Sequence, residues 1–425
     1  MITHPSAAPD LSAAPAPSAA PAPDPIRIAV LSSADGGGGG LAAHRMATAL
    51  NTQPGVQADF LSRRELGGIL PPEVAPPRSM SNRQMTNTHF TVEYPGYRRD
   101  WLIDLLAGYD IVNVHWASFL LGLAELDALA RRGTPMLFML HDFHYMTGGC
   151  HYPAECNKLV LGCHGCPQVD SARCDSRFIP INLRVKRGIF ARPNVHLAAP
   201  SRYLRDRAVA SGLIPEARAH VLRNPYEPLP DPAPHPADGQ VRILLIADSL
   251  VERRKALPLA LDSLGLLQRR IDAGATPQRM RIDVVGTADQ ALQDRLETGG
   301  LDYVLHGRIT DHARLVQIFA ENDILLSCSY EDNWPNILVE ACSYGCVPVV
   351  GPGHGCQEFV TTYGIGAVAP RYEATAFADT LLATATRHDR TDPAPDARAR
   401  IRADHRNEHV AHHFLQIAAA IAPGP

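Results

Sequence analysis

Short apolar runs alternate with stretches whose apolar residues recur at helical spacing, and this alternation occurs as two series along the chain. Such runs are typical of strands that are buried on both faces, and strands that alternate with helices form parallel sheets. The runs of the first series are 26–31, 56–61, 110–115, 135–140, 195–199 and 220–222. The runs of the second series are 241–246, 280–285, 303–306, 323–327 and 347–350. The pattern predicts an α/β protein with two Rossmann-like domains that face each other.

Length and composition divide the chain into segments. At 425 residues, the chain exceeds what one hydrophobic core usually supports. Residues 1–25 are rich in Ala, Pro and Ser and lack the features of a signal peptide, so we predict a disordered tail. Prolines are again frequent in 225–240, which we interpret as a linker between a first domain (26–224) and a second domain (241–395). Residues 396–425 are predicted to contain one terminal helix.

Charge and cysteine content narrow the classes of partner. A net charge of −4 gives no reason to expect nucleic acid. No apolar run approaches the roughly eighteen residues that are needed to cross a bilayer. We therefore expect a cytoplasmic protein, in which nine cysteines are more typical of thiols or metal ligands than of disulfides.

Three acids accompany a predicted strand, loop and helix in the second series. Glu331 and Asp332 follow the run 323–327 and lie in the loop. Helical spacing predicts a helix over 336–343, with Glu340 just over one turn inside it. A helix start favours a phosphate, and carboxylates accept hydrogen bonds from sugar hydroxyls. The unit predicts a sugar-nucleotide site, although such a loop alone also fits an ordinary β–α unit with surface acids.

Two cations follow the first strand of the second series. Arg254 and Lys255 lie shortly after the run 241–246. An arginine contacts phosphate oxygens with a planar fork, whereas a lysine supplies a compact charge. Together they can neutralise a diphosphate leaving group. The alternative interpretation is a solvated basic turn.

Two features follow strands of the first series. The five glycines from Gly36 to Gly40 lie between the run 26–31 and a helical stretch from Leu41, and they would let a ligand approach the backbone. Because the spacing of the dinucleotide fingerprint is absent, a loop without a ligand fits equally well. His141 follows the run 135–140, at a strand end where ligands of parallel sheets lie. A lone histidine is more often structural, but this position favours catalysis.

Four cysteines lie close together in the sequence. They are Cys150, Cys156, Cys163 and Cys166, within a cysteine-rich loop over 147–174. Such a set can form a tetrahedral zinc site, with His151 or His164 as substitute ligands. Because only the last pair has a common zinc spacing, reduced or redox-sensitive thiols are the alternative. Since the loop follows His141, we expect it to shape the acceptor side in either case.

A basic stretch follows the cysteines. Residues 177–207 carry eight Arg or Lys residues among apolar positions. A basic amphipathic helix can lie on an anionic membrane surface, which would suit a lipid-linked acceptor. We favour the alternative, in which these charges form the solvated face of a helix.

Two separate parts of the sequence resemble known enzymes. The run 328–345 resembles the acid-x7-acid element of family 4 retaining glycosyltransferases, with Asp332 and Glu340 at its ends. The family has Glu at the first position, so either Glu331 or Asp332 holds the donor sugar. The run 141–152, together with the four cysteines, resembles a bacterial subgroup of the colanic-acid type that builds exopolysaccharide.

The resemblance implies a fold and an activity. The fold is GT-B, in which two Rossmann-like domains face each other across a cleft, the second domain binds the donor and the last helix commonly returns to the first. The implied reaction is retaining transfer of a hexosyl unit from a UDP- or GDP-sugar to a glycan or lipid-linked saccharide, with no cofactor required. Such an acceptor would bring the protein to the inner membrane surface.

The resemblance also implies roles for individual residues. The catalytic residues by this likeness are His141, Arg254, Lys255, Glu331 and Asp332. The residues that bind the donor by this likeness are Gly38, Gly39, Gly40, Arg308, Ile309, Asn336, Ile337 and Glu340. Arg308 and Ile309 belong to a run that resembles the Leu-Gly-Arg element near the nucleotide base.

Other classes of protein fit parts of the sequence. A sugar-nucleotide epimerase can share the GT-B arrangement and would consume a nucleotide sugar without an acceptor. A non-catalytic, zinc-dependent binding module would depend on the cysteine loop alone. A phosphorylase would need a lysine for pyridoxal phosphate, and no motif indicates one.

Overall fold

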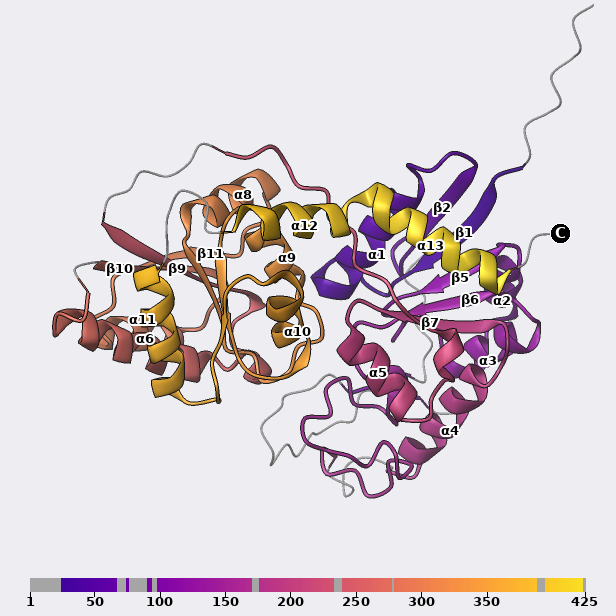
Figure 1. The fold of residues 1–425 in the computed structure, drawn as a ribbon. Coiled ribbons are helices and arrows are strands. Elements are labelled where there is room, and N and C mark those ends of the chain that lie inside the picture. The colour runs from indigo at the N-terminus through magenta and orange to yellow at the C-terminus, as the bar shows by residue number, and fades with distance from the viewer. Residues whose placement is uncertain are drawn as a thin grey trace, which may run out of the picture.

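The protein consists of two halves, each built around a six-stranded sheet (Figure 1). The computed structural model describes residues 24–66, 74–75, 90–93, 98–169, 176–232, 239–276, 279–387 and 394–422. The predicted tail over 1–25 therefore lies outside the described residues, apart from residues 24 and 25.

The first sheet has the strand order β2-β1-β5-β6-β7-β8, and neighbouring strands are parallel. Its strands are β1 (Ile26–Leu31), β2 (Val56–Leu61), β5 (Ile111–Val114), β6 (Met136–Met139), β7 (Val195–Ala199) and β8 (Ala219–Val221). Along β1, Ala29 and Leu31 pack in one core cluster, whereas Ile28 and Val30 pack in another on the opposite face. Because both faces are covered, the strands appear in the sequence as continuous apolar runs.

Helices cover this first sheet. They are α1 (Gly37–Leu50), α2 (Asp100–Ala107), α3 (Leu123–Arg131), α4 (Phe178–Phe190) and α5 (Arg202–Ala210), with 3-10 turns at His144–Met146 and Glu216–Arg218. A separate antiparallel pair is formed by β3 (Val74–Ala75) and β4 (Val92–Glu93).

The sequence predicted that the whole glycine run is a loop, with a helix from Leu41. In the structure, α1 already begins at Gly37, so most of the run is helical. Gly40 lies in the first turn of this helix and packs closely against the preceding backbone. A Cβ at Gly40 would lie 2.3 Å from the carbonyl oxygen of Ala34. The close packing of this first turn therefore requires a glycine there, despite the low helix propensity of that residue.

The second sheet has the order β11-β10-β9-β12-β13-β14 and is also parallel. Its strands are β9 (Gln240–Ser249), β10 (Arg279–Thr287), β11 (Tyr303–Gly307), β12 (Ile324–Ser327), β13 (Val347–Val350) and β14 (Ala367–Val368). Its helices are α6 (Leu257–Asp272), α7 (Gln290–Thr298), α8 (His312–Glu321), α9 (Asn336–Cys342), α10 (His354–Tyr363) and α11 (Ala374–Arg387), with a 3-10 turn at Arg253–Lys255. All eleven predicted runs overlap strands of the two sheets, which confirms the predicted α/β class.

The C-terminal segment joins the two halves. It forms α12 (Pro395–His405) and α13 (Asn407–Ile421), not the single helix that the sequence predicts, because the backbone at Arg406 is extended (φ −55°, ψ 142°). In α12, Ile401 packs in the core of the second half, whereas Phe414 of α13 packs with α1 and β1 of the first half. Figure 1 shows α13 lying across the first half.

No helix in the described part of the chain is long and apolar enough to cross a membrane. The predicted boundaries of the domains and of the linker stay predictions.

Candidate active site between the two halves

The carboxyl ends of β1 and β6 in the first half lie against the loop after β12 in the second half. The side-chain amide of Asn333 donates to the carbonyl oxygen of His141 at 3.0 Å. The side-chain amide of Asn336 donates to the carbonyl oxygen of Gly38 at 3.2 Å. The glycine run, the candidate histidine and the acidic loop, which are far apart in the sequence, therefore meet at one place.

The glycine run packs closely against the candidate histidine. A Cβ at Gly39 would lie 3.3 Å from Cβ of Trp116 and 3.5 Å from Cδ2 of His141. By contrast, a Cβ at Gly38 would meet open space. The backbone of the run can therefore approach a ligand on the same side as the imidazole.

A chain of hydrogen bonds fixes the orientation of His141. Nδ2 of Asn113 donates to the carbonyl oxygen of Leu137 at 2.9 Å, so Oδ1 of Asn113 is an acceptor. That oxygen lies 2.8 Å from Nε2 of His115, which must carry the proton. Nδ1 of neutral His115 then accepts from Nε2 of His141 at 2.9 Å. The network assigns the proton of His141 to Nε2 and leaves its Nδ1 as an acceptor.

Both histidines of this hydrogen-bond network, His115 and His141, are neutral near pH 7. Burial lowers the pKa of His141 to about 4, and the charge of Asp142 opposes this effect only in part. Burial, with His141 beside it, holds the pKa of His115 well below its usual range. A neutral His141 can accept a hydrogen bond from a sugar hydroxyl through Nδ1 without introducing a charge.

Asp332 lies between the two predicted cations. Its Oδ2 accepts from Nζ of Lys255 at 2.6 Å and from Nη1 of Arg254 at 3.1 Å. Burial raises the pKa of Asp332, but the charges of Lys255 and Arg254 outweigh it and hold that pKa below its usual value. Arg254 is also held by Oε1 of Glu252 at 2.7 Å. The ionised Asp332 thus keeps both cations near the carboxyl end of β9, where a diphosphate would lie.

Glu331 has a different environment from its neighbour. Its side chain is buried, and Oε2 accepts from the backbone N–H of Ala154 in the first half at 2.9 Å. Burial raises the pKa of Glu331 to about 7, and the Ala154 N–H and the Arg254 charge lower it only in part. Asp332 is therefore committed to the cations, whereas Glu331 is the acid that faces the first half.

Glu340 is paired with a residue that the sequence did not single out. Its Oε1 accepts from Nη1 of Arg45, on α1, at 2.7 Å, and both side chains are largely buried. The Arg45 guanidinium also lies 5.0 Å from the ring centre of Tyr226. The carboxylate expected to bind a ribose is thus paired with a cation of the first half.

The remaining predicted donor residues lie around this group. Asn336 and Ile337 open α9, and Oδ1 of Asn336 accepts from the side-chain amide of Asn224 at 2.9 Å. Arg308 follows β11 and is exposed, with Nε 3.1 Å from Oδ1 of Asp248. Ile309 is half-buried against the core of the second half. The roles of these residues in binding stay predictions.

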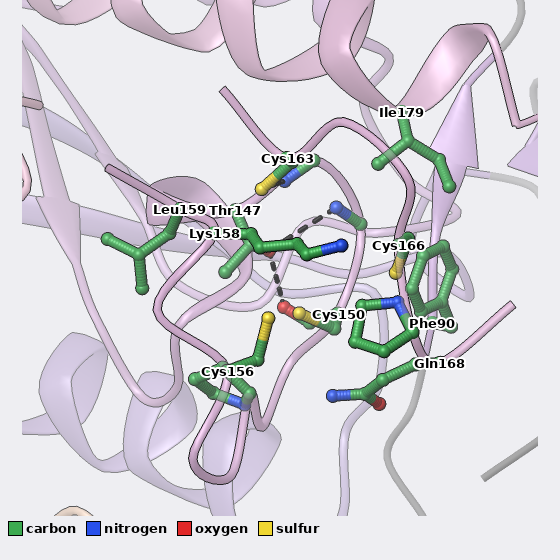
Figure 2. Close-up of a pocket in the computed structure, with 14 residues that line it drawn as sticks. Phe90, Thr147, Cys150, Cys156, Lys158, Leu159, Cys163, Cys166, Gln168 and Ile179 are labelled. Carbon is green, nitrogen blue, oxygen red and sulfur yellow. Dashed lines mark hydrogen bonds between the residues drawn. The ribbon is translucent and has the colours of Figure 1, made fainter. Parts of the chain in front are cut away.

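The four predicted metal ligands line one pocket (Figure 2). The cavity has a volume of about 20 Å³ and is bounded also by Phe90, Thr147 and Ile179. All four cysteines have free thiols. Within the described ranges, no three or more His, Cys, Asp and Glu side chains are grouped as a metal site. The zinc site therefore stays a prediction.

Most apolar side chains of α4, within the basic stretch, pack into the first half. Ile179, Leu183 and Phe190 of α4 are buried in the first half. Lys186 is also buried, and its Nζ donates to the carbonyl oxygens of His144 (2.8 Å) and Thr147 (3.1 Å). These buried positions of α4 thus stabilise the fold, in agreement with the interpretation of the exposed charges as a solvated face.

Sequence reasoning missed several residues of this site. His115 is the last residue of a predicted strand and His141 directly follows one, so the same signal could have indicated His115. Arg45 carries no such signal, because its role depends on how the two halves are placed.

A protein family model matches most of the second half of the chain. Residues 241–387 match the model of the family described as "Glycosyl transferases group 1". The second half contains a group 1 glycosyltransferase domain. This domain includes Arg254, Lys255, both loop acids and Glu340. A search of curated proteins found no match to the chain.

Solved structures share the fold of the whole chain. One is sucrose-phosphate synthase from Thermosynechococcus elongatus, with 15% identity, a TM-score of 0.58, and coverage of 92% of this chain and 97% of that one. A glycosyltransferase from Rickettsia africae has 13% identity and a TM-score of 0.62, covering 94% and 100%. Anabaena HepE in complex with UDP and glucose has 14% identity and a TM-score of 0.58, covering 92% and 98%. Beside the group 1 domain, these likenesses establish the GT-B fold.

Proposed function

We propose that the protein is a retaining glycosyltransferase of the family 4 type that transfers a hexosyl unit from a nucleoside diphosphate sugar to a saccharide acceptor. The observation that carries this proposal is the placement of Arg254 and Lys255 on Asp332, at the carboxyl end of the second sheet and opposite His141. The group 1 domain and the UDP present in the HepE structure support a UDP-sugar donor, with a GDP-sugar as the alternative.

The main catalytic task is to stabilise the charge on the leaving group. When the bond from the sugar to the diphosphate breaks, negative charge develops on the diphosphate, and positive charge develops on an oxocarbenium-like sugar. Lys255 and Arg254 would neutralise the diphosphate, because Asp332 holds them in a fixed arrangement before the donor binds. No motion of long side chains is then needed during the reaction.

Other residues would position the sugar and the nucleoside. Nδ1 of neutral His141 would accept a hydrogen bond from the transferred sugar, and Glu331 would hold its hydroxyls. Glu340 would bind the ribose hydroxyls in exchange for its contact with Arg45. Retention of configuration follows if the acceptor hydroxyl attacks from the side of the leaving group, whose phosphate oxygen can take the proton.

The acceptor would be a glycan or a lipid-linked saccharide, in the synthesis of exopolysaccharide or another surface glycan. This part of the proposal depends on the resemblance of the run 141–152 and the cysteines to enzymes of that class. A cytoplasmic protein that contacts the inner membrane face peripherally would have access to such an acceptor.

The experiment is a donor assay on the full chain with UDP- and GDP-sugars, with and without a saccharide acceptor. We expect release of one nucleoside diphosphate, and Lys255→Met should lower its rate about a hundredfold. Arg279→Met, which removes a charge from the start of β10, should leave the rate unchanged. Consumption of the nucleotide sugar without release of the diphosphate would indicate an epimerase and contradict the proposal.

Metal analysis of the same protein tests the cysteine pocket separately. We propose about one zinc ion per chain, bound by the four thiolates. Folded protein that is free of zinc, and in which all four thiols react once it is unfolded without reductant, would establish the alternative of a reduced cysteine loop.

A further inference from the structure

The first part of the cysteine-rich loop reaches across to the second half. Within the segment 150–156, residues 153–156 form a turn that is closed by a hydrogen bond from the N–H of Cys156 to the carbonyl oxygen of Pro153, at 3.0 Å. Two residues of this segment, Tyr152 and Ala154, contact charged groups of the proposed donor site. The proposed function assigns no role to either.

Ala154 has an unusual backbone conformation at its point of contact. Its φ angle is +52°, in the left-handed region that residues with a side chain rarely adopt. In this conformation its N–H donates to Oε2 of Glu331 at 2.9 Å. The turn is therefore held in a disfavoured geometry where it meets an acid of the other half.

The Arg254 guanidinium lies over the ring of Tyr152. The guanidinium carbon lies 4.2 Å from the centre of the Tyr152 ring. Around its edge, the guanidinium donates to Glu252 and to Asp332. A guanidinium that lies over an aromatic ring and donates two hydrogen bonds to carboxylates has little freedom to reorient.

The loop that carries Tyr152 is itself anchored beside His141. Nδ1 of His151 lies 2.7 Å from Oδ2 of Asp142, and the N–H of Phe143 donates to the carbonyl oxygen of His151 at 2.9 Å. Nε2 of Gln168 donates to the carbonyl oxygen of Tyr152 at 3.2 Å. These hydrogen bonds within the first half hold the backbone that carries the Tyr152 ring in a fixed position.

We propose that Tyr152 is a positioning residue of the donor site, whose ring holds the Arg254 guanidinium in the plane that receives the diphosphate. The inference rests on the proposed function. It assigns the cysteine-rich loop a part in donor binding, in addition to any part in shaping the acceptor side.

The test compares Tyr152→Leu, which removes the ring, with Tyr152→Phe, which keeps it. The probes are UDP and GDP, with uridine and guanosine as matched ligands that lack phosphates, and binding is measured by calorimetry. We expect Tyr152→Leu to weaken binding of the preferred diphosphate about tenfold and to leave the nucleoside unchanged. Tyr152→Phe should bind as the wild type does. Tyr152→Met serves in its place if the leucine variant does not fold.

A double-mutant cycle separates this role from a general effect on the fold. In an Arg254→Lys background, which lacks the planar group, Tyr152→Leu should cause no further loss. Equal loss with nucleoside and diphosphate, unchanged binding in Tyr152→Leu, or loss in Tyr152→Phe would overturn the positioning role alone. Failure of the wild type to bind any nucleoside diphosphate would overturn the proposed function and this inference together.

Discussion

Replacement of Glu331 by Gln should stabilise the unliganded protein above neutral pH. The Glu331 carboxyl is buried, and it accepts a hydrogen bond from a neutral backbone N–H, that of Ala154. Burial therefore raises the pKa of Glu331 from an ordinary value of 4.5 to about 7. A glutamine keeps the shape and can still accept that hydrogen bond, but it never carries a charge.

The magnitude follows from the difference between the folded and unfolded chains. Between pH 4.5 and 7, folded Glu331 keeps a proton that the unfolded chain has released, so the stability falls as the pH rises. Each pH unit lowers the free energy of unfolding by about 1.4 kcal/mol, which gives about 3 kcal/mol over the interval. Above pH 7 the loss of stability in the wild type no longer changes with pH, and the glutamine variant does not have this loss.

Urea unfolding of both proteins at pH 4.5 and at pH 8 measures this difference. We expect nearly equal stability at pH 4.5 and a gain of about 3 kcal/mol for Glu331→Gln at pH 8. Glu297→Gln, at an exposed site on α7, should show no gain at either pH. A gain that is equal at the two pH values, or a loss at pH 8, would refute the reasoning.

Two further predictions concern residues that hold the site in place. Asn113→Leu should lower kcat about tenfold while the affinity for the nucleoside diphosphate changes little, because the proton on His141 is no longer fixed at Nε2. Steady-state kinetics measures kcat and calorimetry measures the affinity. An equal fall in affinity would contradict this prediction. Arg45→Met should lower the free energy of unfolding by about 2 kcal/mol, because the substitution leaves the largely buried Glu340 carboxylate without its cation. Urea unfolding measures this change, and unchanged stability would contradict a structural role for the pair.

The fold could be predicted from the sequence because both sheets are buried on two faces. Continuous apolar runs such as 26–31 and 347–350 became strands with the same bounds. Where tertiary packing decides, the sequence was less informative. The break at Arg406 has no glycine or proline to mark it, and the helical start at Gly37 runs against glycine propensity.

The site could be predicted from the sequence only in part, for a related reason. Residues that follow a strand, such as His141 and Asp332, could be placed because parallel sheets bind ligands at that end. Contacts between the halves, such as those of Arg45 and Tyr152, depend on the relative position of two domains. No local pattern in the sequence specifies that position.

The most direct measurement is a thermal-shift panel of the full chain with UDP, GDP, ADP and dTDP. A ligand that binds only the folded protein raises its melting temperature by mass action. We predict stabilisation by one of these nucleotides in the wild type and its loss in Lys255→Met, with Arg279→Met behaving as the wild type. Stabilisation by none of them, or equal stabilisation of the Lys255 variant, would contradict a donor site built on this lysine.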